Sequence, residues 1–230
     1  MTVEVRPLQL AVPAAAAGVV DAAVHEPGRA RGRTVLLLPG AGGDLDSEPL
    51  VALAEVVASC GHRVVRANLP HHQAGRRAPR AETAVPACQE ILSAAQEALP
   101  GKPPWVLGGR SFGGRVASLA VAAGTEAAGL LFSGYPLHPP GKPERLRVDH
   151  WPNVGVPCLF LQGDSDPLAD LELLNAHRRK LPRRSQLEVV AGGDHALRVT
   201  AARSPDGAPR SPAAAAQDLR GAVCAWLAER

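Results

Sequence analysis

A repeated succession of short apolar runs and longer helical patterns restricts the fold more than any other feature of the sequence. The run Thr34–Leu38 ends in four aliphatic residues, which is typical of a strand buried on both faces. Similar runs return along the chain, and helical patterns lie between most of them. Strands that alternate with helices predict a mostly parallel sheet covered by helices on both faces. The predicted strands are 2–11, 17–25, 34–38, 63–67, 105–107, 128–132, 156–161 and 186–190, and the predicted helices are about 48–60, 82–99, 111–123, 168–180 and 213–229.

The length of the chain favours a single domain. Its 230 residues are 46% hydrophobic, which is enough for one sizeable core and too little for two. We therefore predict one domain over 1–230, in which only 203–211 has the composition of a flexible loop.

Charge and hydropathy exclude several function classes. The formal net charge of +3 is small and the basic residues are scattered, which argues against nucleic-acid binding. No window of about 20 apolar residues predicts a membrane span. Residues 7–20 are fairly apolar, but Glu4 and two prolines make them a poor signal peptide, so we expect a cytoplasmic protein.

The cysteines and histidines do not predict a metal site. Cys60, Cys88, Cys158 and Cys224 are widely separated and form no C-x-x-C, so we expect reduced thiols rather than zinc ligands or a disulfide framework. The adjacent His71 and His72 lack a nearby acidic or cysteine partner and are interpreted as residues of a solvated loop. No metal and no cofactor is expected.

One short motif points to nucleophilic chemistry. Residues Gly109–Gly113 match G-x-S-x-G and lie directly between a predicted strand and a predicted helix. Glycines beside Ser111 make room for a strained turn that exposes the serine hydroxyl. The helix that follows aims backbone N–H groups at a developing oxyanion. We predict that Ser111 is a nucleophile.

A base and an acid follow Ser111 in the chain order Ser, acid, His that this strand–turn–helix motif requires. His195 comes after a predicted strand, in Gly192-Gly193-Asp194-His195, and is predicted to act as general base and then acid. Asp166, in the loop after another strand, is the preferred orienting carboxylate, and Asp164 is the alternative. Asp194 is expected to point elsewhere, in a turn or capping role.

The oxyanion of such a reaction needs two N–H donors. We predict the N–H of Phe112, which follows the nucleophile, and the N–H of Ala41, in the glycine-rich turn after the first buried strand. A nucleotide-binding loop is the competing interpretation of these turns. The dinucleotide fingerprint fails because Leu45 occupies its third glycine position, and the P-loop fails because Gly114-Arg115 replaces the required Lys-Ser/Thr pair.

With these motifs in place, the chain resembles the small α/β-hydrolases that include the testis-expressed hydrolase-like protein and the hydrolase-like domain of an NSL histone-acetyltransferase complex subunit. It is similar, more distantly, to dienelactone hydrolases. The resemblance implies an α/β-hydrolase fold, the triad positions and a hydrolase activity. Pro39 departs from a histidine common in this family, and Ser111 stands where dienelactone hydrolases have cysteine. The matching segments are LLLPGAGGDLD (36–46), RANLPH (66–71), GGRSFGGR (108–115), SGYPLHPPGKPERLR (133–147), LFLQGDSDPL (159–168) and GGDHAL (192–197).

Two loops are expected at the edge of the site. Tyr135, His138 and Lys142 lie in the loop that follows a predicted strand, where they contact substrate or simply form a rigid proline-rich rim. Arg110, with the basic loop 76–80, favours an anionic acyl substrate, and a solvated basic loop is the plainer interpretation. The loop after Ser133 leaves no room for a helical lid, so we expect a shallow, open site.

These features together predict a serine hydrolase that acts on a small-molecule ester or thioester through an acyl-enzyme on Ser111. Two other functions stay open at this point, an acyltransferase with the same intermediate and a non-catalytic protein-interaction module built on the same fold. The substrate and the oligomeric state are not predicted.

Overall fold

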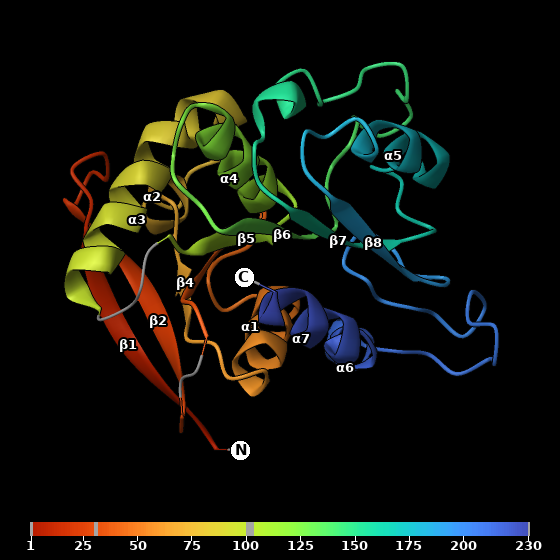
Figure 1. Cartoon of the computed structure of the whole chain (residues 1–230), viewed down its shortest axis with the longest axis horizontal. Helices are drawn as coiled ribbons and strands as arrows, with labels where there is room; N and C mark the ends of the chain where they lie inside the picture. The colour runs from red at the N-terminus through yellow and green to blue at the C-terminus, as the bar shows by residue number, and fades with distance from the viewer. Residues whose placement is uncertain (1, 30–31, 100–103, 230) are drawn as a thin grey trace.

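The protein is described by a computed structural model that covers residues 2–29, 32–99 and 104–229. Its described strands form one sheet of eight strands in the order β1-β2-β4-β3-β5-β6-β7-β8 (Figure 1). The first two strands form an antiparallel hairpin, and β2 pairs antiparallel with β4. All other pairs are parallel, so the predicted mostly parallel sheet is confirmed. The strands are β1 (Val3–Ala11), β2 (Val19–Pro27), β3 (Val35–Leu38), β4 (Val64–Ala67), β5 (Val106–Arg110), β6 (Gly129–Ser133), β7 (Cys158–Gly163) and β8 (Ser185–Val190).

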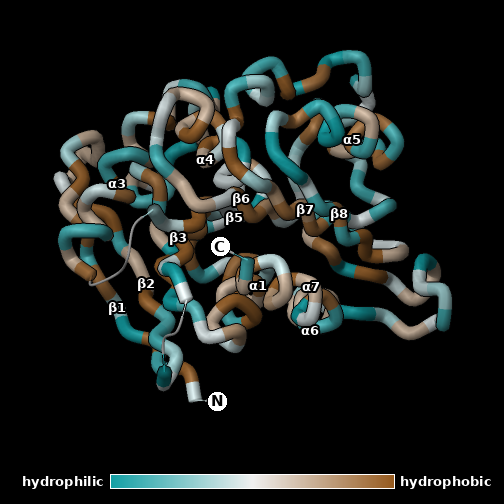
Figure 2. Tube along the Cα trace, viewed as in Figure 1, coloured by the Kyte–Doolittle hydropathy of each residue, from teal (hydrophilic) through white to brown (hydrophobic). Residues whose placement is uncertain are grey.

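Helices cover both faces of the sheet (Figure 1). Successive side chains of a strand point to opposite faces, so Leu36 and Leu38 of β3 enter the core beneath α3, α4 and α5, whereas Val35 and Leu37 enter the core beneath α1, α6 and α7. In Figure 2 the hydrophobic colour is concentrated in the middle layer, between the two sets of helices. The helices are α1 (Glu48–Ser59), α2 (Pro70–Gln73), α3 (Val85–Ala98), α4 (Phe112–Ala122), α5 (Leu171–Arg178), α6 (Pro212–Asp218) and α7 (Arg220–Ala228), with the 3-10 turns η1 (Ala81–Ala84) and η2 (Trp151–Asn153).

Two of the predicted helices are each divided. The predicted helix 82–99 consists of η1 and α3, and Pro86 lies in the first turn of α3, where its missing N–H costs no hydrogen bond. The predicted helix 213–229 is divided at Leu219 into α6 and α7. The loop 203–211 is held by Asp206, which pairs with Arg210 at 2.9 Å, and by a bridge between Arg210 and Val199. No helix in the described part of the chain is long and apolar enough to cross a membrane.

The expectation of four reduced thiols is wrong. Cys60, at the end of α1, forms a disulfide with Cys224 of α7, and their Cα atoms are 5.2 Å apart. Both helices pack on the same face of the sheet, which brings together two residues that are 164 positions apart in sequence. Cys88 and Cys158 are buried and take no part in a disulfide within the described residues. Because disulfides persist mainly in oxidising compartments, this bond removes the support that reduced thiols lent to a cytoplasmic location.

We predict that reduction of this disulfide lowers the free energy of unfolding by about 3–5 kcal/mol, because the bond closes a very long loop in the unfolded chain. The measurement is urea unfolding of the oxidised protein with and without dithiothreitol. The Cys60→Ser/Cys224→Ser double variant is the control, and its unfolding should be insensitive to dithiothreitol. Four titratable thiols in oxidised, denatured protein would contradict the prediction.

Candidate active site

Ser111 lies in a strained turn between β5 and α4. Its φ of 48° and ψ of −112° are rarely adopted by a residue with a side chain. The glycines on either side explain why the turn is possible. A Cβ on Gly109 or on Gly113 would collide with the carbonyl oxygen of Leu38 in the neighbouring strand β3. The G-x-S-x-G spacing is therefore required because the turn approaches β3 too closely for side chains at these two positions.

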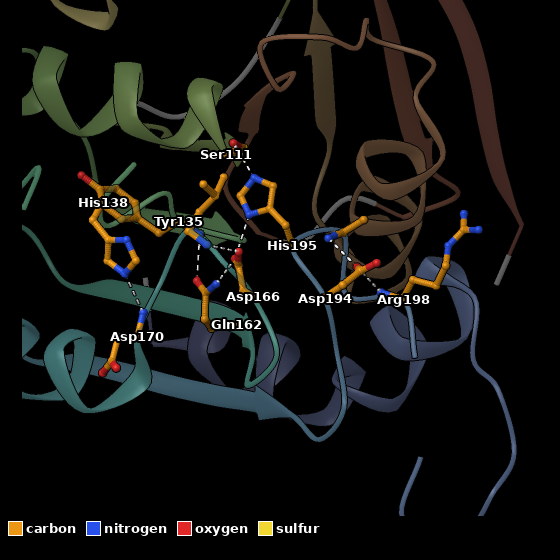
Figure 3. A network of polar contacts seen from close by, with 11 residues as sticks. Ser111, Tyr135, His138, Gln162, Asp166, Asp170, Asp194, His195 and Arg198 are labelled. Carbon is orange, nitrogen blue, oxygen red and sulfur yellow. Dashed lines mark hydrogen bonds and ion pairs between the residues drawn. The ribbon is translucent and has the colours of Figure 1, made fainter. Parts of the chain in front are cut away.

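Ser111, His195 and Asp166 form one hydrogen-bonded row (Figure 3). The Ser111 Oγ lies 2.8 Å from His195 Nε2, and His195 Nδ1 lies 2.7 Å from Asp166 Oδ2. The three residues follow β5, β8 and β7, whose carboxyl ends meet at one edge of the sheet. The Asp166 side chain is fully buried, while 19% of the His195 side chain is exposed. The row therefore runs from the protein interior to Ser111, which lines an open cleft.

The surroundings of the three nearby carboxylates separate their roles. Asp166 accepts from the Leu168 N–H at 2.8 Å as well as facing His195, whereas Asp164 accepts from the Gly192 N–H at 2.8 Å and holds a turn. Asp194 accepts from the N–H groups of Ala196 and Arg198 and points away from the row, as its predicted turn role requires (Figure 3). The geometry favours Asp166 over Asp164 as the partner of His195.

Gln162 belongs to this row and is missing from the set of residues derived from the sequence. It is fully buried in β7, and its Nε2 donates to Asp166 Oδ2 at 2.5 Å. Its Oε1 accepts from the Tyr135 N–H at 2.8 Å, which fixes the amide orientation (Figure 3). A single polar residue inside the otherwise apolar run LFLQG is the signal that could have identified it.

The glycine-rich turn after β3 lies beside Ser111. Ala41 lines the same cleft as Ser111 and Phe112. Among the described residues, no hydrogen bond has the Ala41 N–H or the Phe112 N–H as its donor. Two donors without partners at a serine are what an oxyanion requires.

The interpretation of His71 and His72 as solvated loop residues is wrong. Both lie in α2, and His72 accepts from the Leu69 N–H through Nδ1, so its Nε2 carries the proton and donates to the Gly40 carbonyl at 2.9 Å. Burial lowers the pKa of His72, and the hydrogen bond to the Gly40 carbonyl offsets part of this shift. His71 is buried edge-on against Phe112, and burial lowers its pKa to about 4. Neutral histidines thus contact the two segments that carry the predicted oxyanion donors, the start of α4 and the glycine-rich turn 40–43, which is the predicted oxyanion turn.

The placement of Tyr135 and His138 corrects the expectation that they contact substrate. Tyr135 is 1% exposed, and its hydroxyl donates to the Arg147 carbonyl and accepts from Trp151 Nε1 at 3.1 Å. His138 is buried and accepts from the Asp170 N–H through Nε2 (Figure 3). Both side chains hold the proline-rich loop in place by hydrogen bonds on its inner side. This placement favours the alternative that the loop forms a rigid rim. Lys142 is exposed in the same loop.

Arg110 is half-buried behind the oxyanion turn. One of its guanidinium nitrogens fills the space in which a Cβ on Gly40 would lie. Burial lowers the pKa of Arg110, while the negative charges of Asp166 and Asp194 raise it. It is not among the described residues that line the cleft at Ser111, so it stays a candidate for positioning the turn.

An open cleft of about 920 Å³ leads away from Ser111. Ala41, Ser111 and Phe112 are among its lining residues. The others come mainly from η1, α4 and the loop 136–149. That loop connects β6 and β7 with only η2 as regular structure, so no lid domain covers the cleft from this side. Within the described residues, no group of three or more His, Cys, Asp or Glu is arranged to hold a metal ion.

The fold and this row of residues define a protein of the α/β-hydrolase type. The chain belongs to the family described as "Alpha/beta hydrolase domain", whose model matches residues 31–220. Its fold resembles an α/β serine hydrolase without lid from Xanthomonas campestris, with a TM-score of 0.69, 20% identity and coverage of 99% of this chain and 97% of that one. A dienelactone hydrolase from Anabaena variabilis has a TM-score of 0.72 at 15% identity, with 100% and 99% covered.

A sequence relative matches only a short segment. A protein of Synechocystis sp. named as a non-heme chloroperoxidase is 40% identical over 52 residues, which make up 23% of this chain and 19% of that protein. The structural likenesses, at 20% identity or less, establish the fold alone.

Proposed function

We propose that the protein is a serine hydrolase that cleaves a small ester or thioester through an acyl-enzyme on Ser111. The observation that carries the proposal is the row from Ser111 Oγ through His195 to the buried Asp166, with contacts of 2.8 and 2.7 Å. This is the arrangement in which a serine hydroxyl becomes a nucleophile, because a base accepts its proton and a carboxylate orients that base. The α/β-hydrolase fold is consistent with it.

In the first half-reaction, Ser111 Oγ attacks the carbonyl carbon while its proton passes to His195 Nε2. Asp166 holds the Nδ1–H of His195 and stabilises the imidazolium. The Ala41 and Phe112 N–H groups donate hydrogen bonds to the oxyanion. Collapse of the tetrahedral intermediate breaks the bond to the leaving group, which takes the proton from His195 and departs as an alcohol or thiol.

In the second half-reaction, water attacks the acyl-enzyme and gives its proton to His195. The tetrahedral intermediate then releases the carboxylic acid, and the proton on His195 returns to Ser111 Oγ. If an alcohol or amine replaces this water, the same residues catalyse acyl transfer. The resemblance to the testis-expressed and NSL-subunit group belongs to this proposal, since the motif segments of that group include all three residues of the row.

A fluorophosphonate probe tests the proposal directly, because it reacts with an activated serine. We expect stoichiometric labelling and a single modified peptide that contains Ser111, followed by release of acid from a panel of short-chain esters and thioesters. A folded protein that neither labels nor turns over any of these compounds would favour the interaction module instead. Product analysis with added alcohols separates hydrolysis from acyl transfer.

We predict that His72→Phe lowers kcat about tenfold with a smaller change in KM, because Gly40 loses the donor that holds the oxyanion turn. His72→Gln, which keeps an N–H donor, should restore part of the loss. The control is His62→Gln, another buried histidine bonded to a backbone carbonyl, at the opposite edge of the sheet. An unchanged kcat in His72→Phe would show that the turn needs no such support.

A further inference from the structure

The charges in the cleft at Ser111 are distributed unevenly. Its acidic residues, Glu82, Glu144 and Asp149, are all exposed at the rim. By contrast, two of its arginines, Arg115 and Arg147, are half-buried. A buried cation attracts a ligand more strongly than a solvated one, because fewer water molecules screen it. The exposed charges of the cleft are therefore of both signs, since Arg80 and Arg145 are exposed as well, whereas its two half-buried charges are both positive.

Few carboxylates neutralise the positive charges of the two arginines. Arg115 pairs with Glu82 at 2.5 Å, but Glu82 is half-exposed, and the Arg115 Nε has no hydrogen-bond partner among the described residues. No carboxylate within the described chain forms an ion pair with Arg147. Burial lowers the pKa of the Arg147 guanidinium and the positive charge of Arg115 lowers it further, while the negative charge of Glu82 partly offsets these effects. An anion between the two guanidinium groups would relieve this repulsion.

One of the two arginines, Arg115, lies close to Ser111 along the chain, and Arg147 lines the same cleft. Arg115 follows Ser111 by four residues, so it lies one helical turn along α4, about 6 Å further on. Apolar groups of Phe112, Pro136 and Leu146 line the same cleft. The cleft thus combines a nucleophile, apolar groups and two guanidinium groups, which matches a short acyl chain with an anionic end.

The position of His195 indicates which part of the substrate occupies the cleft. His195 must protonate the leaving group, so the leaving group lies on the His195 side of Ser111. His195 is not among the described residues that line the cleft. The acyl portion is therefore the part that extends toward Arg115 and Arg147.

Resting on the hydrolase function above, we propose that the preferred substrates are esters or thioesters whose acyl chain ends in an anionic oxygen group held by Arg115 and Arg147. A guanidinium group presents its N–H donors as a planar fork, which fits a carboxylate or a phosphate through two parallel hydrogen bonds. Arg80 and Arg145, exposed on the same cleft, add to the attraction during approach.

The test compares matched pairs of esters. Monoethyl adipate and ethyl hexanoate have the same chain and differ in a terminal carboxylate, and ethyl ω-phosphonopentanoate supplies the phosphate-type group. A hexanoate ester with its carboxylate on the alcohol side is the positional control. We expect kcat/KM to be at least about tenfold higher for one of the acyl anions than for ethyl hexanoate at low salt, and the ratio to shrink as salt is added.

The variants are compared by the ratio of kcat/KM for the charged ester to kcat/KM for the neutral ester. This ratio does not depend on how much of each variant is folded. Arg147→Gln should lower the ratio of charged to neutral ester about tenfold. Arg147→Lys should restore only part of it, because the fork is lost. Arg183→Gln is the matched control, since Arg183 is exposed just before β8, at the opposite edge of the sheet.

The outcomes separate this inference from the hydrolase proposal. If no ester is hydrolysed and Ser111 is not labelled, the hydrolase proposal fails. If kcat/KM for ethyl hexanoate equals kcat/KM for the acyl anions, the inference alone fails. It also fails if Arg147→Gln leaves the ratio of charged to neutral ester unchanged. Preference for the alcohol-side anion would overturn the assignment of the cleft to the acyl group.

Discussion

Ser111→Ala should lower kcat/KM for ester hydrolysis by about 10⁴-fold or more and abolish labelling by a fluorophosphonate. The variant keeps Ala41 and Phe112 as oxyanion donors and keeps His195, but it has no atom that can bond to the acyl group. Only a direct attack by water remains, which accounts for the residual rate. The measurement is steady-state hydrolysis of the best ester of the panel, with labelling followed by mass spectrometry.

The matched control for this prediction is Ser165→Ala. Ser165 lies in the loop after β7, and its hydroxyl bonds to Asp164 rather than to the row. Its loss should change kcat/KM by less than about threefold. Both variants should keep the wild-type circular dichroism spectrum. Retained esterase activity and labelling in Ser111→Ala would refute the acyl-enzyme on Ser111.

Asp166→Asn should lower kcat by about 10³- to 10⁴-fold. An asparagine has the same shape, but it can present an NH₂ group to His195 Nδ1, which then favours the tautomer with its proton on Nε2. That tautomer cannot accept the proton of Ser111. The lost negative charge also leaves the imidazolium of the transition state without its stabilising partner. The pH–rate profile of the variant should accompany the kcat measurement.

Asp164→Asn is the comparison for this second prediction. Asp164 holds the Gly192 N–H and Ser165 but not His195, so its replacement should reduce stability with only a small change in kcat. If Asp164→Asn loses as much activity as Asp166→Asn, the acid has been assigned to the wrong carboxylate. Gln162→Leu adds a finer check, because it removes the hydrogen bond from the Gln162 side chain to Asp166 while the new side chain has a similar volume.

Much of the fold could be predicted because its signals are local. The apolar run at β3 depends only on neighbours in sequence, and it forms a fully buried strand as expected. Ser111, Asp166 and His195 follow parallel strands, and in such sheets the carboxyl ends of the strands meet at one edge. The chain order of these residues was therefore enough to predict that they come together.

Other features needed the tertiary structure because they join residues that no local pattern relates. Gly40 lies in the turn after β3 and His72 lies in α2, so no local pattern predicts the hydrogen bond between them or the position of His72 beside that turn. Tyr135 and His138 lie in the expected loop, but only packing shows that their side chains turn inward.

By itself, the sequence determined the alternation of strands and helices and the reacting serine in its glycine turn, because backbone sterics and hydrophobic periodicity act over a few residues. The tertiary structure alone decided that Cys60 bonds to Cys224 and that Arg115 and Arg147 line the same cleft as Ser111. Such pairs depend on how whole elements pack, and that depends on the summed burial of the core rather than on any short segment.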